Sequence, residues 1–576
     1  MHHPLGAAGA ALLFGCWASV ALAQSVDFTL VSSAGTTDLG PGYSAEPAYF
    51  YNGTVPGPLL RVTEGQTVRL RYINDLATED SIVHLHGQPV DLGMDGAAGI
   101  SRPSVAPGQE FRYVYDDLRP GTYWYHPHSE NFHHQIERGM HGVFIVDPLN
   151  TANEPAYDVE HVIVLDDWYG PGGSSFSGHL LNGKTSAGQT PISVTVGQRL
   201  KLRVVNTSFR TNYTFALDGH PMTVTHSDGY RLQNVVTDAI PLGIGERYQV
   251  IVECNNPGTW SLAVSLAKDR AATVVRGVVQ YSGQTGAPPS SSFVPANLSS
   301  GALLSYSQLA SFDPSPISTP DVVAPMVLSM QSSPTRFLIN NEAWPAITPT
   351  VVNTGDVVQM DYISNMMGQA WHPMHLHGHH VRLKGTAGGV THAPIKDTVL
   401  LRPTGNLWSS ASVQFVADNP GRWLMHCHDM NHMMSGMMTA IDYAGDTDGD
   451  GIPDSRDMEP TADTPVLTLS ENGADFLPGG SGLIDVQWQP GEACSLLVSL
   501  FERTPPLLVA PAGLLYLADT APYGAMVVAG NEVGSWPYAI PNSSILSGLA
   551  INLQGFCGTT LPGGLRLSTF QPLNIR

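Results

Sequence analysis

Histidines recur in this sequence two residues apart. The 576-residue chain has 22 histidines, for which chance predicts about one His-x-His triplet. Five such pairs are present: His84/His86, His126/His128, His375/His377, His377/His379 and His426/His428. On an extended strand, residues i and i+2 face the same side, about 6.6 Å apart. The pattern therefore predicts imidazole pairs that bind adjacent metal ions.

A cysteine lies inside the last of these pairs. Strand alternation directs Cys427 to the face opposite His426 and His428. One strand can thus hold a thiolate-bound metal on one side and imidazole-bound metals on the other. A ligand set of one Cys with His and a distant Met favours copper over zinc and is typical of a blue electron-transfer copper.

Four segments carry these residues, and together they resemble the four copper motifs of the multicopper oxidases, in the family's order, over about residues 45 to 443. The segments are His84-Leu85-His86-Gly87, Trp124-Tyr125-His126-Pro127-His128, His372-Pro373-Met374-His375-Leu376-His377-Gly378, and His426-Cys427-His428 followed by His432 and Gly436-Met437.

The resemblance implies four copper ions and a ligand for each. A type 1 copper would be held by His372, Cys427 and His432 with Met437 as axial ligand, a type 2 copper by His84 and His375, and a type 3 pair by His86, His126, His128, His377, His426 and His428. The implied activity is a copper-dependent, laccase-like oxidoreductase. It would couple four one-electron oxidations of a reducing substrate to the reduction of dioxygen to water.

Asp95 is a second candidate catalytic residue, in addition to Cys427. It lies nine residues after His86 and matches the acidic residue that family members use near the type 2 copper to pass protons. The alternative is a turn aspartate before Gly96. Where some members carry a glutamate after the last histidine ligand, this sequence has Met433.

The elements that position these residues are expected to be strands. Alternating runs are punctuated by Gly, Pro and Asn, with few helical stretches, which predicts an all-β fold. A Gly-containing turn followed by a strand recurs at 63–70, 195–202 and 353–360, which predicts three related domains that each open in this way. The resemblance implies that these are cupredoxin-like Greek-key sandwiches, with the copper cluster between the first and third.

Composition predicts the domain boundaries. An apolar stretch ending in Ala21-Leu22-Ala23 indicates a signal peptide over residues 1–23. The expected units are then domain 1 (24–148), domain 2 (155–283), a Ser/Pro/Gly/Ala-rich linker (284–325), domain 3 (326–444), an Asp-rich repeat (446–460) and a β-rich C-terminal domain (463–576).

The Asp-rich repeat is a candidate calcium site, because oxygen ligands alternate along it and Gly451 permits a tight turn. The candidate ligand positions are Asp446, Asp448, Asp450, Ile452, Asp454 and Asp457. The alternative is a solvated acidic linker.

Charge and hydropathy exclude two classes of partner. Lys and Arg number 27 against 49 Asp and Glu, a net charge of −22, and no basic run is long enough to follow a nucleic acid backbone. After the signal, no apolar run of about 18 residues predicts stable membrane insertion. We expect an exported protein, periplasmic or extracellular, in which Cys494 and Cys557 can pair.

The reducing substrate stays open at this stage. Phenols, aromatic amines and low-valent metal ions are the candidates, with dioxygen as the acceptor. One alternative is a dedicated cuprous oxidase for metal detoxification, in which some of the ten methionines between residues 360 and 438 guide Cu(I). The alternative interpretation is that those methionines pack the hydrophobic core. Further alternatives are a copper nitrite reductase and a non-enzymatic copper-binding scaffold.

Overall fold

The computed structural model describes residues 25–129, 133–170, 177–366, 371–402 and 409–445 with their side chains. Beyond residue 465 it describes the backbone of strands β31 to β39. The predicted signal peptide and the candidate calcium positions, Asp446 to Asp457, lie outside the described residues.

The first sandwich consists of two sheets, ordered β2-β1-β4-β6 and β3-β8-β7-β5. Its elements are β1 (Ser25–Thr37), β2 (Glu46–Tyr51), β3 (Leu60–Thr63), β4 (Thr67–Asn74), β5 (His84–His86), α1 (Leu92–Asp95), β6 (Glu110–Tyr115), β7 (Gly121–His126), α2 (His133–Glu137) and β8 (Gly142–Asp147).

The second sandwich has sheets ordered β10-β9-β12-β17-β14-β15 and β11-β19-β18-β13-β16. Its elements are β9 (Val159–Tyr169), β10 (Ser177–Leu181), η2 (Ser186–Gly188), β11 (Ile192–Val194), β12 (Arg199–Asn206), β13 (Tyr213–Leu217), β14 (Met222–Ser227), β15 (Tyr230–Thr237), β16 (Ile240–Leu242), β17 (Arg247–Glu253), β18 (Thr259–Leu266) and β19 (Val275–Tyr281).

The third sandwich has sheets ordered β21-β20-β23-β28-β25-β26 and β22-β30-β29-β24-β27. Its elements are β20 (Val322–Ser332), β21 (Thr335–Ile339), β22 (Thr350–Val352), β23 (Val357–Ser364), β24 (His372–Leu376), β25 (Val381–Leu383), β26 (Ile395–Lys396), β27 (Thr398–Leu401), β28 (Ser409–Val416), β29 (Arg422–Cys427), α4 (Met430–Met434) and β30 (Met438–Tyr443).

The C-terminal strands form three smaller sheets, ordered β31-β32-β37, β36-β33-β38-β39 and β34-β35. They are β31 (Val466–Ser470), β32 (Ser481–Gln487), β33 (Ala493–Ser499), β34 (Glu502–Val509), β35 (Gly513–Leu517), β36 (Ala521–Val527), β37 (Val533–Ala539), β38 (Ala550–Gly558) and β39 (Leu565–Asn574). The register of β33 and β38 places Cys494 directly opposite Cys557.

All three sandwiches repeat one strand order, in which the first strand pairs in parallel with the fourth: β1 with β4, β9 with β12 and β20 with β23. The recurring Gly-containing segment joins the third strand to the fourth in each sandwich, so it does not open the domain as the sequence predicted. Its glycines, Gly65, Gly197 and Gly355, have φ values of 80°, 87° and 93°. Only glycine adopts these values without strain, which is why the residue recurs.

Alternating burial fixes which face of each strand meets the core. In β23, for example, Val358, Met360 and Tyr362 are buried while their neighbours are partly exposed. The segment predicted as a linker between the second and third domains is also packed. It carries α3 (Ala296–Ser299) and η3 (Tyr306–Gln308), and its Leu298, Leu304 and Leu309 are buried against the second sandwich.

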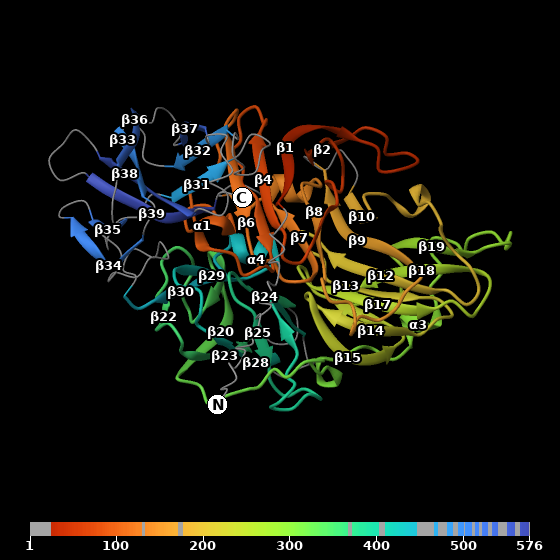
Figure 1. The fold of residues 1–576 in the computed structure, drawn as a ribbon. Helices are drawn as coiled ribbons and strands as arrows, with labels where there is room; N and C mark the ends of the chain where they lie inside the picture. The colour runs from red at the N-terminus through yellow and green to blue at the C-terminus, as the bar shows by residue number, and fades with distance from the viewer. Residues whose placement is uncertain are drawn as a thin grey trace, which may run out of the picture.

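Figure 1 shows the three sandwiches meeting near the centre of the molecule, coloured red to orange, yellow to green, and green to teal in chain order. Fully buried charges join them there. Arg247 of β17 makes two 2.6 Å hydrogen bonds to the carboxylate of Asp397 in the third sandwich. Its Nε donates to the carbonyl of Thr122 in the first sandwich, at 2.9 Å. One guanidinium therefore connects all three sandwiches.

A buried ammonium group lies next to this contact. Lys396 Nζ is 3.0 Å from carboxylate oxygens of both Asp228 and Glu246, and these three side chains are fully buried. Burial of an unpaired charge is very costly, so each charge here depends on its partners. Within the described residues, no helix is long and apolar enough to cross a membrane.

The Arg247 contact generates a stability prediction. Arg247→Met leaves the buried carboxylate of Asp397 without its cation and should lower the free energy of unfolding by about 3–5 kcal/mol. Arg71→Met removes an ion pair with Glu110 whose side chains are 47% and 34% exposed, and it should cost less than about 1 kcal/mol. Urea unfolding followed by tryptophan fluorescence measures both. Equal costs for the two variants would contradict the assigned role of Arg247.

Candidate metal centre

Equivalent strand pairs of the first and third sandwiches supply the paired histidines. In the first, β5 pairs with β7 so that His84 lies opposite His126. In the third, β24 pairs with β29 so that His375 lies opposite His426. The corresponding strands of the second sandwich, β13 and β18, carry no histidine. The two histidine-bearing pairs meet at the boundary between the first and third sandwiches.

Eight histidines come together at this boundary as three groups, and we refer to them as the histidine cluster. Within each group the ligand atoms lie within 4.8 Å of one another: His84, His86 and His375; His86, His126 and His428; His128, His377 and His426. All eight side chains are buried.

Three of the paired motifs cross a strand end, which the sequence did not predict. β7 ends at His126, β24 at Leu376 and β29 at Cys427. The second histidine of each pair therefore lies just beyond a strand. The ring centroids within the four pairs of the cluster lie 4.9 to 6.1 Å apart. In each of these three motifs the two histidines belong to neighbouring groups of the cluster, as expected for ligands of adjacent metal ions.

Most cluster rings are held through Nδ1, which leaves Nε2 directed into the cluster. The Nδ1 contacts are His84 to the Asp95 carbonyl at 2.7 Å, His126 to the Pro127 carbonyl at 3.0 Å, His375 to the Asp397 carbonyl at 2.9 Å and His426 to the Cys427 carbonyl at 3.1 Å. The Nε2 atoms of His84, His126, His375 and His428 are buried without a hydrogen-bond partner. A metal ion would satisfy such nitrogens, since buried polar atoms are usually paired.

His86 is held the other way round. Its Nε2 lies 3.2 Å from Asp397 Oδ1 and 3.1 Å from Thr398 Oγ1, and its Nδ1 is buried without a partner. Sequence reasoning did not find Asp397, which is 311 residues away along the chain. The same carboxylate accepts both hydrogen bonds from Arg247. The charged contact between the sandwiches therefore also orients a cluster histidine.

Asp95 contacts two cluster histidines. Its Oδ2 is 2.9 Å from His377 Nδ1, and its backbone carbonyl accepts from His84 Nδ1. Gly96 ends α1 with a φ of 78°, and a Cβ there would lie 1.8 Å from the carbonyl oxygen of Val83. The turn at Gly96 and the contacts of Asp95 with the two histidines are thus one feature, because the turn holds Asp95 next to the cluster.

The cluster favours neutral imidazoles. Burial, together with the neighbouring imidazoles, lowers the pKa values of His86, His128 and His377 well below the usual range. Burial lowers the pKa of His426 to about 4. Neutral imidazole is the form that binds a metal ion, so the ligands require little deprotonation at neutral pH.

A second group, the cysteine site, lies on the other side of β29. Cys427 Sγ is 3.7 Å from His372 Nδ1 and 3.5 Å from His432 Nδ1. His432 comes from α4, which Asp429 caps by accepting a hydrogen bond from the Asn431 amide at 3.1 Å. Met437 is fully buried in the same apolar core as Cys427. Burial raises the pKa of the Cys427 thiol, so a bound cation is needed to hold the thiolate.

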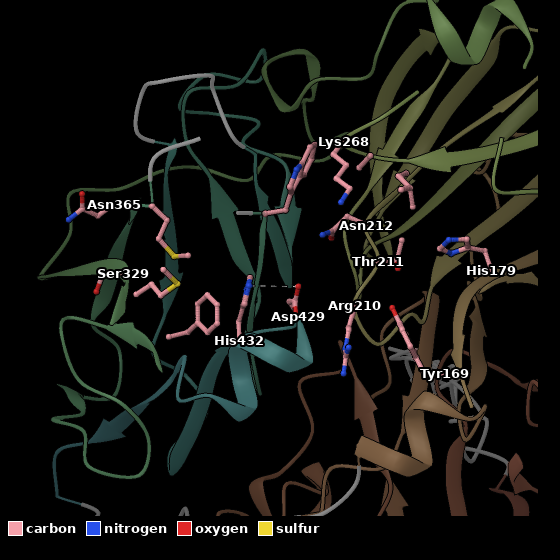
Figure 2. Close-up of a pocket in the computed structure, with 16 residues that line it drawn as sticks. Tyr169, His179, Arg210, Thr211, Asn212, Lys268, Ser329, Asn365, Asp429 and His432 are labelled. Atoms are coloured by element: carbon pink, nitrogen blue, oxygen red, sulfur yellow. Dashed lines mark ion pairs between the residues drawn. The ribbon is translucent and has the colours of Figure 1, made fainter. Parts of the chain in front are cut away.

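A cavity of about 770 Å³ adjoins His432, and we call it the His432 pocket. In Figure 2, Asp429 and His432 lie between side chains of the second sandwich (Tyr169, His179, Arg210, Thr211, Asn212 and Lys268) and side chains of the third (Ser329 and Asn365). Of the three residues of the cysteine site, His372, Cys427 and His432, only His432 is among the described residues that line this pocket.

Comparison with known proteins identifies the family. Three family models, each described as multicopper oxidase, match residues 35–151, 160–284 and 318–446. The multicopper oxidase MmcO of Mycobacterium tuberculosis is 30% identical over 470 residues, which cover 73% of this chain and 87% of that protein. The chain belongs to the multicopper oxidase family.

Other relatives of this oxidase include Laccase-5 of Trametes villosa, which is 28% identical over 71% of this chain and 88% of that protein. Among solved structures, Fet3p, described as a multicopper oxidase that functions in iron import, has a TM-score of 0.65 at 22% identity, covering 78% of this chain and 94% of that one. The laccase from Botrytis aclada has a TM-score of 0.62 at 23% identity, covering 73% and 88%. These likenesses confirm the predicted cupredoxin-like fold.

The predicted family and its copper cofactor are therefore confirmed for this oxidase, and the unpartnered nitrogens fit that metal. The structure brings together all the histidines named from the motifs, Cys427 and Asp95. It adds Asp397, Thr398 and Arg247, which no local motif marks. The second member of the His377/His379 pair lies outside the cluster, and its Nε2 is 2.7 Å from the hydroxyl of Tyr443.

Copper removal should destabilise the oxidase, because it leaves buried nitrogens of several cluster histidines without partners. We expect the midpoint of thermal unfolding to fall by about 5 °C or more on chelation under reducing conditions. Calorimetry on the copper-loaded and chelated protein measures the change. Re-addition of copper is the control and should restore the original midpoint. An unchanged midpoint after verified copper loss would contradict this.

Proposed function

We propose that this oxidase holds four copper ions and couples the one-electron oxidation of a reductant to the reduction of dioxygen to water. In this proposal His372, Cys427 and His432 bind the type 1 ion, with Met437 as axial ligand. His84 and His375 bind the type 2 ion, and the other six cluster histidines bind the type 3 pair. The observation that carries the proposal is the set of unpartnered, buried imidazole nitrogens in two adjoining sandwiches.

When bound, copper supplies one-electron redox chemistry, and four electrons with four protons convert one dioxygen to two waters. The protein chain itself contributes a covalent connection between the cysteine site and the histidine cluster. Cys427 is covalently joined to His426 and His428, and these side chains belong to different centres. A single short stretch of backbone therefore links the site that receives electrons to the site where oxygen is reduced.

Asp95 is proposed to hold and release protons at the cluster. Its Oδ2 is 2.9 Å from His377 Nδ1, while its Oδ1 makes no hydrogen bond and lies 3.3 Å from His84 Nδ1. A carboxylate held in this way between two cluster histidines can take up a proton without leaving its position. Met433, at the position where some family members carry a glutamate, packs with Met430, Phe209 and Leu424 in an apolar core.

The reductant is proposed to bind in the His432 pocket. Relatives include laccases and a protein that functions in iron import, so family membership leaves phenols, aromatic amines and metal ions as candidate substrates. The charges of the pocket favour an organic reductant over Cu(I). Met430 and Met433 are buried in an apolar core, so they offer no sulfur to an incoming ion. Met330 and Met366 do line the pocket, so a cuprous oxidase is the alternative that the substrate tests must address.

A non-enzymatic scaffold is the second candidate, and the site argues against it, because the described residues keep every ligand that the motifs predict. We further propose that the oxidase is exported. The apolar segment ending in Ala21-Leu22-Ala23 supports this. So does the register that places Cys494 opposite Cys557, as an extracellular disulfide would require.

Cys427→Ser tests the copper assignment. The change replaces a soft thiolate with a hard hydroxyl, so we expect the blue absorption and turnover to be lost while the histidine cluster keeps its copper. Metal analysis should give about four ions per wild-type chain and about three in the variant. Cys254→Ala, at the other buried cysteine, is the control and should stay blue. A blue, active Cys427→Ser variant would refute the assignment.

Asp95→Asn tests proton delivery. The amide keeps the size of the carboxylate but cannot accept a proton, so oxygen reduction should slow by about tenfold or more. Reduction of the blue site by substrate should stay normal in stopped-flow measurements without oxygen. Asp91→Asn, on the exposed start of the same turn, serves as the matched control. Equal turnover in the two variants would return Asp95 to a purely structural role.

A further inference from the structure

The His432 pocket has a charge pattern opposite to that of the whole molecule. The protein carries a net charge of −22. Among the described residues that line the pocket, however, the cations Arg210 and Lys268 face a single carboxylate, Asp429. A long-range acidic field attracts cations to the surface generally, whereas a bound substrate is selected by the charges within a few ångströms.

Lys268 is the least neutralised of these charges. It follows β18 on an exposed turn and makes no ion pair with any residue that the structure describes. The turn is anchored, because the amide of Ala267 donates to the carbonyl of Asn212 at 2.8 Å. Figure 2 shows Lys268 and Asn212 together on the second-sandwich side of the pocket. An ammonium group on an anchored turn can meet an anion at a defined place.

Arg210 is positioned by stacking and is only partly neutralised. Its guanidinium lies 4.8 Å from the ring of Tyr169 and 5.0 Å from the ring of Phe209. Glu137 approaches it on one side at 3.5 Å. A guanidinium has five N–H donors, so this single long contact leaves donors for a ligand.

The side chain of Asp429 is already hydrogen-bonded to its own helix, α4. Its side chain accepts a hydrogen bond from the Asn431 amide as the cap of α4. A metal-ion substrate is attracted by carboxylates and thioethers and is repelled by neighbouring cations. Met330 and Met366 also line the pocket, but Asp429 is the one carboxylate among its described lining residues and Arg210 and Lys268 are two cations, so the charge balance disfavours a cation.

The remaining wall suits an aromatic ring. The ring of Phe337 lies 4.1 Å from that of His432, and Trp371 and Leu266 also line the cavity. An aromatic reductant can therefore pack beside His432 with an acidic substituent directed at the second sandwich.

We propose that this oxidase selects an aromatic reductant that carries a negative charge, of the phenolic carboxylate class, and that Lys268 with Arg210 determines this preference. The inference rests on the proposed function, which places the reductant in the His432 pocket. The substrate is oxidised by one electron at the phenol, which also loses its proton, and the electron is taken by the established oxidase activity. The carboxylate is not changed.

The test compares 4-hydroxy-3-methoxybenzoate with its methyl ester, using the copper-loaded enzyme and oxygen uptake. Lys268→Glu should lower the ratio of kcat/KM for the acid to that for the ester by about tenfold, and Lys268→Met by a smaller factor. Lys184→Glu makes the same charge change on an exposed lysine of the second sandwich outside the pocket. It should leave the ratio unchanged.

A binding measurement separates recognition from electron transfer. Calorimetry with the redox-inert 4-methoxybenzoate should show tighter binding than with 4-methoxybenzamide, and Lys268→Glu should remove the difference. Oxidation of both phenols with a ratio unaffected by Lys268→Glu would overturn the inference while leaving the proposed function intact. If the enzyme oxidised a metal ion but neither phenol, the proposal of an organic substrate would be wrong, and so would this inference.

Discussion

Every imidazole in the histidine cluster has two nitrogens, and a metal ion can use only one of them. In a site closed to water, the other nitrogen must find a partner in the protein. Backbone carbonyls of Asp95, Pro127, Asp397 and Cys427 fill that need for four rings. The path of the backbone around the cluster is therefore constrained by the rings it must hold, as well as by the strands it connects.

The second sandwich illustrates how far this constraint extends. It supplies no member of the histidine cluster, yet its Arg247 fixes the carboxylate that orients His86. It also supplies the basic wall of the pocket beside His432. One sandwich without cluster histidines thus supports the histidine cluster through a buried ion pair and lines the His432 pocket with positive charge.

Sequence reasoning found the histidines that the fold brings together, because each motif is local: two histidines and the turn after them are neighbours along the chain. The same reasoning could not find Asp397 or Arg247, whose pairing joins residues 150 apart and depends on how two sandwiches dock. It placed the Gly65 repeat correctly as a turn but wrongly as the start of a domain, since parallel pairing of β1 with β4 leaves no periodic signal of its own. The sequence also could not predict the charges of the His432 pocket, because Lys268 and His432 are brought together only by the fold.

The boundary position of the histidine cluster has a consequence for biosynthesis. About 250 residues separate His128, the last cluster histidine of the first sandwich, from His375, the first of the third. At about 5 to 20 residues per second, the ribosome needs roughly 10 to 50 s to make that interval. Each of the three groups combines histidines of both sandwiches, so none of them is complete until the third sandwich has been synthesised and has docked on the first.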